Sequence, residues 1–280
     1  MIQPIQNVAQ YMDFIQSIQC DDRYCDPMLL TKEQFERNLE QAVGRPGYDA
    51  FVTLDHGDPT GLFVFLALPK EHYLEMLVGI SRLSTAYGEM LKYIATRYSE
   101  YNADFIFNPK NDLLREQLAA LRAQFEPEQQ KLIFSQHIPE ILIDGIEPLA
   151  SKYYHEYLAI HRVDTYWTGE KVAHAPDRFR VLLALDEEKV VGYLDATYHL
   201  NENEPYDLFV LPEYRRKGHG RRLLAKALQL NEPYAMHARI DIDNHPALRL
   251  FESLGFRRVN RQNSIAAHCV LKSSFQKSPD

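Results

Sequence analysis

The chain has 280 residues, of which 45% are hydrophobic and 25% charged, and its formal net charge is −8. This balance is typical of a globular protein with one large domain or two ordinary ones, and it argues against a general nucleic-acid binder, which needs a basic surface. No apolar run reaches the length of a membrane span, and the first residues lack the pattern of a secretory signal, so we expect a cytoplasmic protein without membrane partners.

The first half of the chain begins with a mostly helical section. Apolar residues recur at helical spacing over residues 5–18 and 31–43, which predicts two amphipathic helices. An alternating series of strands and helices is expected after them. The predicted strands are 50–54, 61–67, 73–78 and 103–108, and the predicted helices are 86–98 and 112–124.

The second half repeats this order of elements. Residues 135–139 are the expected junction, and a first strand at 140–144 precedes helices at 148–160 and 168–173. Gly255 is expected to end the last helix of the series. The further predicted strands are 178–186, 190–198, 206–211 and 234–242, and the further predicted helices are 219–229 and 246–254.

The two halves are related by a constant offset of 132 residues. Val78 corresponds to Val210 and Gly88 to Gly220, although few residues are identical between the halves. One continuous α/β domain would make this similarity a coincidence. Because each half has the same element order and its own apolar face, we instead predict two tandem domains, 1–137 and 138–280.

A basic glycine loop follows the strand expected at 206–211 and leads directly into a helix. Residues 214–222 hold five positive side chains in nine positions, within an acidic chain. The free N–H groups and the dipole at a helix start favour phosphate oxygens, and glycine lets the backbone approach a ligand closely. The sequence therefore predicts a site for a small anionic ligand, formed by Arg215, Arg216, Lys217, Gly218, Gly220 and Arg221.

Two common phosphate motifs do not fit this loop. A Walker loop would continue with Lys and Ser or Thr after Gly220, but Arg221 and Arg222 follow. A dinucleotide fingerprint would need a third glycine at Leu223. The three cysteines of the chain have no Cys or His partners at zinc-like spacing, so we expect reduced thiols and no metal site.

Two blocks of the second half resemble the GNAT superfamily of acetyl-CoA-dependent N-acetyltransferases. The block 210–224 is similar to the family's Arg/Gln-x-x-Gly-x-Gly/Ala pattern, which follows a strand ending in Val-x-Pro. The block 243–256 is similar to the family's Asn-x-x-Ala…Gly-Phe segment. The resemblance covers about residues 140–275. The matching residues are Arg215, Gly218, Gly220, Asn244, Ala247, Gly255 and Phe256.

The resemblance implies an α/β (α+β) fold with two tandem GNAT-like domains, each a mixed, mostly antiparallel sheet flanked by helices. It also implies that acetyl-CoA lies in a splayed gap between strands 206–211 and 235–242 and passes its acetyl group to an amine of a small molecule or peptide. Many members of the family are homodimers. The implied coenzyme A contacts are the backbone of Phe209 and Val210, the loop residues Arg215, Arg216, Lys217, Gly218, His219, Gly220 and Arg221, and Asn244.

The resemblance leaves the catalytic groups open. Direct attack on the thioester needs a neutral amine, and hence a base, and a proton donor for the leaving thiolate. Where the family's usual acid is a tyrosine, this chain has Phe251, so Tyr206, His245 or water remain as donors, or the thiolate leaves unaided. Glu204 is the candidate base, with Asp207 nearby, although Glu204 fits equally well as a solvated loop residue.

The first half has lost the phosphate loop. At the aligned positions it keeps Gly88 but has Leu83 in place of Arg215 and Ala86 in place of Gly218. We therefore expect a degenerate domain that binds no coenzyme A and supports the second one or shapes its acceptor cleft. Two functions remain: an N-acetyltransferase, or a non-catalytic acyl-CoA-binding or regulatory module, which the missing tyrosine acid motivates.

Overall fold

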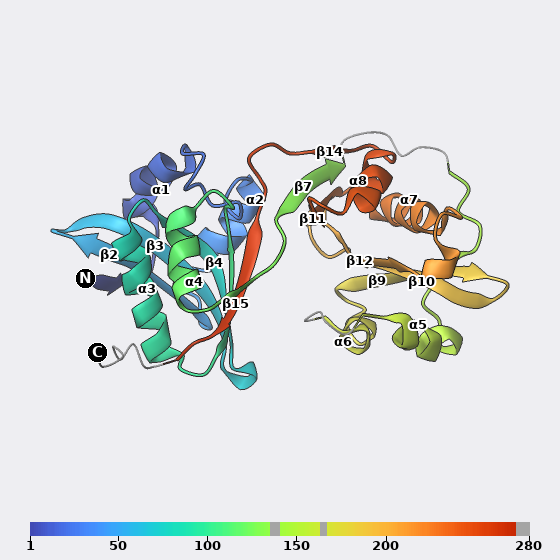
Figure 1. Ribbon diagram of the computed structural model, residues 1–280, viewed down its shortest axis with the longest axis horizontal. Coiled ribbons are helices and arrows are strands. Elements are labelled where there is room, and N and C mark those ends of the chain that lie inside the picture. Colours follow the sequence, from blue (N-terminus) through green and yellow to red (C-terminus); the bar gives the residue numbers. More distant parts are fainter. Residues whose placement is uncertain (135–140, 163–166, 273–280) are drawn as a thin grey trace. The chain divides into compact units, whose positions relative to one another are not determined.

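The computed structural model describes residues 1–134, 141–162 and 167–272, which form two compact units (Figure 1). The N-terminal unit consists of Met1–Gln129 with Asn260–Asp280, and the C-terminal unit consists of Gln130–Val259. The predicted division at residue 137 is therefore wrong in its boundaries, because one strand from each half belongs to the other half's sheet. None of the described helices has the length and apolar sequence that a bilayer span requires.

In its described residues, the N-terminal unit is built on one sheet of seven strands in the order β1-β2-β3-β4-β5-β15-β6. Neighbouring strands are antiparallel, apart from the parallel pair β4 and β5. The strands are β1 (Ile2–Pro4), β2 (Tyr48–Asp55), β3 (Asp58–Leu68), β4 (Tyr73–Ser81), β5 (Asn102–Phe107), β6 (Gln124–Phe125) and β15 (Ile265–Val270).

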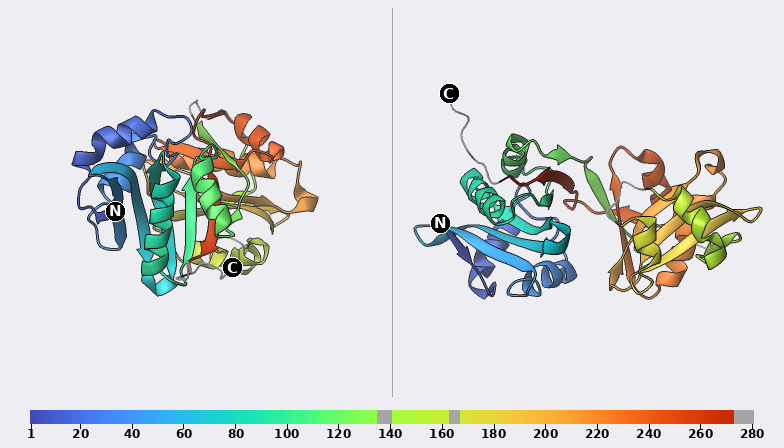
Figure 2. Two further views of the ribbon diagram at one scale, coloured as in Figure 1. Left: turned by 60° about the vertical axis from the view of Figure 1, so that its left-hand side comes forward. Right: turned by 90° about the horizontal axis from the view of Figure 1, so that it is seen from below.

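Helices cover both faces of this sheet, because apolar side chains alternate between its faces along β2 and β3. Phe51 and Phe65 pack under α3 and α4, which lie side by side on one face (Figure 2). Val52 and Val64 face the other side, against α1. The helices are α1 (Met12–Gln19), α2 (Lys32–Phe35), α3 (Ser84–Arg97) and α4 (Asp112–Ala120).

The predicted helix at 5–18 starts later than expected. Ile2–Pro4 pairs with β2, and the Ile5 N–H continues this pairing by donating to the Ala50 carbonyl at 2.9 Å. The backbone therefore stays extended through Ile5, and α1 begins at Met12 after a 3₁₀ turn at Ala9–Tyr11.

The described residues of the C-terminal unit form two sheets of four strands, β12-β10-β9-β8 and β11-β13-β7-β14. The expected first strand at 140–144 is wrong in its described part, because residues 141–143 have no regular structure and a turn closed by the Ile146 N–H and the Ile143 carbonyl follows them. Residues 135–140 lie outside the described chain. The strands are β7 (Gln129–Phe134), β8 (Ile146–Pro148), β9 (Phe179–Asp186), β10 (Lys189–Thr197), β11 (Glu202–Asn203), β12 (Pro205–Val210), β13 (Ala235–Asp241) and β14 (Phe256–Arg258).

Helices again cover both faces. Leu224 of α7 and Leu248 of α8 pack with Leu194 on one face, and Tyr157 of α5 packs with Tyr193 on the other. Each unit is thus a mixed, mostly antiparallel arrangement flanked by helices, which confirms the predicted fold class. The helices are α5 (Tyr154–Ile160), α6 (Gly169–Ala173), α7 (His219–Asn231) and α8 (His245–Glu252).

The two units exchange one strand with each other. β15, from the second half of the chain, lies between β5 and β6 of the N-terminal unit, whereas β7, from the first half, lies between β13 and β14 (Figure 1). The offset of 132 residues places β6 on β14 and β5 on β13. Each half of the chain therefore forms two corresponding strands, and the strand that lies between them comes from the other half.

His268 fixes the exchanged strand β15 in the N-terminal sheet. Its Nδ1 lies 2.6 Å from Oδ1 of Asp104 on β5, and its Nε2 lies 2.9 Å from Oε1 of Glu126 beside β6. The hydrogen bond to Asp104 raises the pKa of His268, burial opposes it, and Glu126 adds to the rise, which brings the value to about 9. The imidazolium is therefore a charged link between the three strands at neutral pH.

We expect the attachment of β15 to weaken as the pH rises through 9. A folded-state pKa above the unfolded value stabilises the fold fully below about pH 6.5, and this contribution is lost as the pH passes the folded pKa. For a side chain 38% exposed, solvent screening leaves about 1 kcal/mol. The protection factors of the amides of residues 265–270, which are corrected for the faster intrinsic exchange at high pH, measure this at pH 6.5 and pH 9.5. His268→Gln is expected to remove the pH dependence of the protection. The control His56→Gln, on an exposed turn, should keep it. An unchanged pH dependence in His268→Gln would contradict the role given to His268.

Candidate functional site

The basic loop ends at Gly218, which is the N-cap of α7 with a φ of +87°. A Cβ at this position would have no atom within 4 Å, so the backbone angle, and not the space, favours glycine. The first helical bond runs from the Arg222 N–H to the Gly218 carbonyl at 3.0 Å. Within the described chain, the N–H groups of residues 218–221 have no acceptor, so they form the kind of helix start that binds anions.

Two of the loop's cationic side chains also make contacts within the domain. Arg215 donates from Nε to the Val210 carbonyl at 3.0 Å, and its guanidinium lies 5.8 Å from the centre of the Phe209 ring. Arg215 therefore braces the end of β12, next to the predicted cofactor-arm residues. The Lys217 Nζ lies 4.7 Å from the centre of the Tyr214 ring.

His219 and Arg221, at the start of α7, lie in different environments. The His219 side chain is buried, and its Nδ1 lies 2.9 Å from Nη2 of Arg222, which also donates to the Asp144 carbonyl. Burial and then the Arg222 charge lower the pKa of His219, so the ring is neutral. The neutral ring therefore accepts from Arg222 through Nδ1 and keeps its Nε2–H group as a donor. Arg216 and Arg221 are exposed and provide the positive charge.

The strands on either side of the predicted cofactor gap belong to different sheets. β12 pairs with β10, whereas β13 pairs with the short strand β11 through Glu202–Ala235 and Asn203–Met236. β11 continues almost directly into β12. The chain that forms β11 and β12 therefore lies beside β13 up to Met236, and beyond this residue β12 and β13 separate. Pro205 begins β12 and has no N–H group with which to extend the pairing.

A β-bulge occurs where the two sheets separate. The register between β10 and β12 passes from Asp195–Asp207 to Ala196–Pro205, which leaves Tyr206 as the extra residue. The Tyr206 ring lies 5.9 Å from that of Phe179. Burial, followed by the charge of Glu204, raises the pKa of Tyr206 to about 12. Its phenol is therefore protonated at neutral pH and can act as a proton donor.

Glu204 and His237 meet at the same point. The Glu204 Oε2 lies 3.0 Å from the His237 Nε2 on β13, and the Glu204 backbone is held by the Thr197 hydroxyl at 2.8 Å. The sequence analysis did not single out His237. Its signal is a polar residue between Met236 and Ala238, which both face the α7 side of the sheet, so alternation turns the imidazole to the opposite face.

Comparison with protein families gives a direct match to this region. A family model described as an acetyltransferase (GNAT) domain matches residues 177–258, which include β9, β10, β12, the basic loop, α7 and β13. This region is a GNAT acetyltransferase domain. The recognition made from the two sequence blocks is thereby confirmed.

Solved structures of the same fold cover the whole chain. A GCN5-related N-acetyltransferase from Sphaerobacter thermophilus has a TM-score of 0.60 at 11% identity, over 97% of this chain and 96% of that one. A tandem GNAT protein from the clavulanic acid biosynthesis pathway has a TM-score of 0.52 at 12% identity, over 98% and 99%. At these identities the likeness concerns the fold alone, and that fold is the predicted tandem GNAT arrangement.

A curated relative matches a shorter segment. A protein of Mycobacterium leprae, described as uncharacterized, is 34% identical over 77 residues, which are 26% of this chain. The match covers 21% of the length of that relative, about one fifth.

Two residues in the second block of the GNAT domain have structural roles. Phe251 is buried at 5% exposure and packs edge-on against Phe256 at 5.0 Å, so the position of the family's usual acid belongs to the core. Asn244 caps α8 by accepting a hydrogen bond from the Ala247 N–H at 3.2 Å. Asn244 is exposed, and its role toward the cofactor stays a prediction. His245, the remaining donor candidate, is the exposed first residue of α8.

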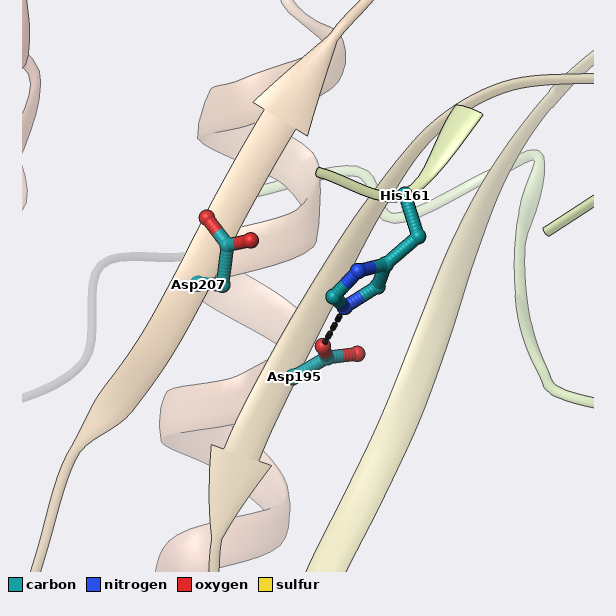
Figure 3. Close-up of side chains that lie close together, drawn as sticks. All are labelled: His161, Asp195 and Asp207. Atoms are coloured by element: carbon teal, nitrogen blue, oxygen red, sulfur yellow. Dashed lines mark hydrogen bonds and ion pairs between the residues drawn. The ribbon is translucent and has the colours of Figure 1, made fainter. Parts of the chain in front are cut away.

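A buried polar cluster lies on the α5 face of the GNAT domain, and its ionisable side chains converge there (Figure 3). His161 Nε2 lies 2.8 Å from Asp195 Oδ2, which Tyr157 also contacts. Burial lowers the pKa of His161, but its hydrogen bonds to Asp195 and to the Arg162 carbonyl outweigh this and raise the value overall. The charged form of the imidazole is therefore favoured beside Asp195, although burial raises the pKa of that carboxyl.

Asp207 belongs to the same cluster and is not available as a base. Its carboxylate accepts hydrogen bonds from Arg162 and, at 2.7 Å, from the Tyr193 hydroxyl, and it is 2% exposed. His161, Asp195 and Asp207 offer ligand atoms within 4.8 Å of one another, as a metal site would. Because Arg162 and His161 already bond to both carboxylates, we assign the cluster to the stabilisation of β10 and β12.

In the N-terminal unit, the corresponding gap between β4 and β5 is closed by the chain itself. These strands pair from Tyr73 to Met76, and beyond this point the Asp26 carboxylate accepts the Gly79 N–H at 2.8 Å. Asn108, just after β5, donates to the carbonyls of Asp22 and Cys25 at 3.0 and 3.2 Å. The segment 22–26 thus links the ends of both strands, where a cofactor arm would need to lie.

The helix start of this unit is also filled. Tyr87, aligned with His219, is fully buried, and its hydroxyl bonds to the Ser81 N–H at 3.1 Å and to the Asn111 amide at 2.8 Å. The side chain takes up the space beside the start of α3. This unit also has Leu83 in place of Arg215 and Ala86 in place of Gly218. We therefore expect the first GNAT-like domain to bind no coenzyme A.

Proposed function

We propose that the GNAT domain transfers the acetyl group of acetyl-CoA to a primary amine of a small molecule or peptide. The observation that carries the proposal is the helix start at residues 218–221, whose N–H groups lie directly beyond the end of β12. A pyrophosphate fits this site because the helix dipole and the exposed Arg216 and Arg221 favour its charge.

The order of elements sets the direction of the cofactor. With its pyrophosphate at the start of α7, the cofactor arm would run along β12 beside Val210 and Phe209, toward the point where β12 and β13 separate. Its acetyl end would then lie near Glu204, His237 and Tyr206. The predicted pyrophosphate-binding residues would thus lie at one end of the cofactor, and the polar groups where the sheets separate would lie at the other.

The polar groups suit an acyl transfer. The pair Glu204–His237 would take the proton that the amine must lose, and the lone pair of the amine nitrogen would attack the thioester carbonyl carbon. The carbon–sulfur bond would break as the amide forms, and the protonated phenol of Tyr206 would supply a proton to the leaving thiolate. The acidic groups at this point, with the net charge of −8, favour a cationic amine.

Thiol release from acetyl-CoA tests the proposal across polyamines, amino acids and aminoglycosides, with calorimetry to count bound coenzyme A. We expect release with at least one amine class and one coenzyme A per chain. Binding without turnover on any amine would favour the acyl-CoA-binding module that the buried Phe251 motivates. A second bound coenzyme A would contradict the closed gap of the N-terminal unit.

Gly218→Asp tests the position of the pyrophosphate. The aspartate carboxylate would add a negative charge beside the N–H groups at the start of α7 and is expected to repel phosphate. We expect coenzyme A to bind at least about 100-fold more weakly. The matched control is Gly57→Asp, because Gly57 also has a positive φ, +97°, and no atom within 4 Å of an added Cβ. Equal affinity of the two variants would refute the placement.

A further inference from the structure

Lys131 is a buried cation that the first half of the chain delivers into the GNAT domain's sheet. It lies on the exchanged strand β7, and its side chain is 1% exposed. Its Nζ lies 3.5 Å from the Glu202 Oε1 on β11. Burial lowers the pKa of the ammonium, and Glu202 opposes this effect. Burying an ammonium group costs free energy unless a nearby negative charge compensates it. Lys131 therefore depends on Glu202 at this position.

The charges continue from Lys131 to the sheet separation. The Glu202 Oε2 lies 3.9 Å from the His237 Nδ1, and the other ring nitrogen lies 3.0 Å from the Glu204 carboxylate. The strand order β11-β13-β7 makes these side chains neighbours across one face. Arg239, on the same strand as His237, is the further cation that acts on Lys131.

The contacts that Lys131 and His237 make with Glu202 support an electrostatic role for these side chains. Within the described chain, the buried Lys131 Nζ and His237 Nδ1 meet no partner with hydrogen-bond geometry, although Glu202 faces both of them. Their interaction with Glu202 is therefore one of charge at 3.5 to 3.9 Å. In a buried setting, charges at this distance shift the proton affinity of a neighbour strongly.

We propose that Lys131 is a positioning residue of the acetyl-transfer site, which sets the proton affinity of the His237–Glu204 pair through Glu202. The inference rests on the proposed function, and it gives the first half of the chain a direct part in the second half's chemistry. The degenerate half then supplies a charge to the reaction through the exchanged strand, in addition to support for the fold.

The test uses the full chain, three variants at Lys131 and Glu202, and one control variant. Lys131→Met removes a positive charge near His237, so the His237 titration midpoint, followed by NMR, should rise by about 0.5 to 1 unit. Glu202→Gln removes a negative charge and should lower the midpoint by a similar amount. Lys131→Arg should keep it near the wild-type value, and so should the control Lys226→Met on α7. The ascending limb of the pH profile of kcat/KM should move with the midpoint.

Opposite shifts in Lys131→Met and Glu202→Gln support the proposal, because a packing role would not reverse sign. Shifts in the same direction, or shifts below about 0.2 unit in both, would overturn it. If Lys131→Met does not fold, Lys131→Gln removes the same charge with a polar side chain, and the direction of its shift decides. The NMR measurement needs no turnover, so it separates a failure of this inference from a failure of the proposed acetyl transfer.

Discussion

Glu204→Gln is expected to lower kcat by about 10² to 10³, the usual contribution of a positioned general base. Glutamine keeps the shape of the side chain and can still bond to His237, which lies 3.0 Å away, but it cannot accept the amine's proton. Because the pyrophosphate site lies at the other end of β12, coenzyme A should bind with unchanged affinity. Steady-state kinetics with the best amine of the panel, together with calorimetry, measures both quantities.

Three further variants make this result specific. Glu147→Gln, an exposed glutamate on β8, is the matched control and should keep full activity. His237→Asn should also lower kcat, and the double variant should be no slower than the worse single one, because groups that act as a unit are not additive. A Glu204→Gln enzyme within threefold of the wild-type rate would show that Glu204 is a solvated loop residue.

The sequence predicted those parts of the fold that depend on local patterns. The hairpin β9–β10 and the helix α7 after a glycine loop both rest on residues close together in the chain. Because the two halves are related by an offset of 132 residues, the elements predicted in one half supported those at the corresponding positions of the other. A glycine with a φ of +87° at the start of α7 is likewise a local requirement, so Gly218 could be recognised from its motif.

The parts that sequence reasoning missed depend on contacts between distant residues. β7 and β15 pair with strands more than 100 residues away, and neither has a neighbouring turn that would indicate its partner. Lys131 reads as an ordinary surface lysine until β7 is placed beside β13. Arg215 illustrates the converse: its charge suggested phosphate binding, yet its Nε is committed to the Val210 carbonyl by a turn that the motif does not reveal.

Removal of the exchanged strand β15 is expected to unfold the N-terminal unit. A chain that ends at Val259 leaves β5 without the partner to which all six of its residues are paired, and it exposes the edges of both β5 and β6. It also loses the buried Ile265 and Leu271, each worth about 1.5–3 kcal/mol of burial. With the lost ladder and the His268 link, the sum approaches the whole stability of a domain, about 5–15 kcal/mol.

A chain that ends at Lys272 is the matched control, because it keeps β15 and the Leu271 contact while it removes the last eight residues. Circular dichroism and thermal unfolding should show two folded units for this control and a loss of cooperative unfolding in the N-terminal unit for the chain ending at Val259. The C-terminal unit keeps β7 in both chains, so the single tryptophan, Trp167, should report a folded GNAT domain in each. If the shorter chain unfolded like the control, β15 would be dispensable, and the exchange of strands would not be what holds the first unit together.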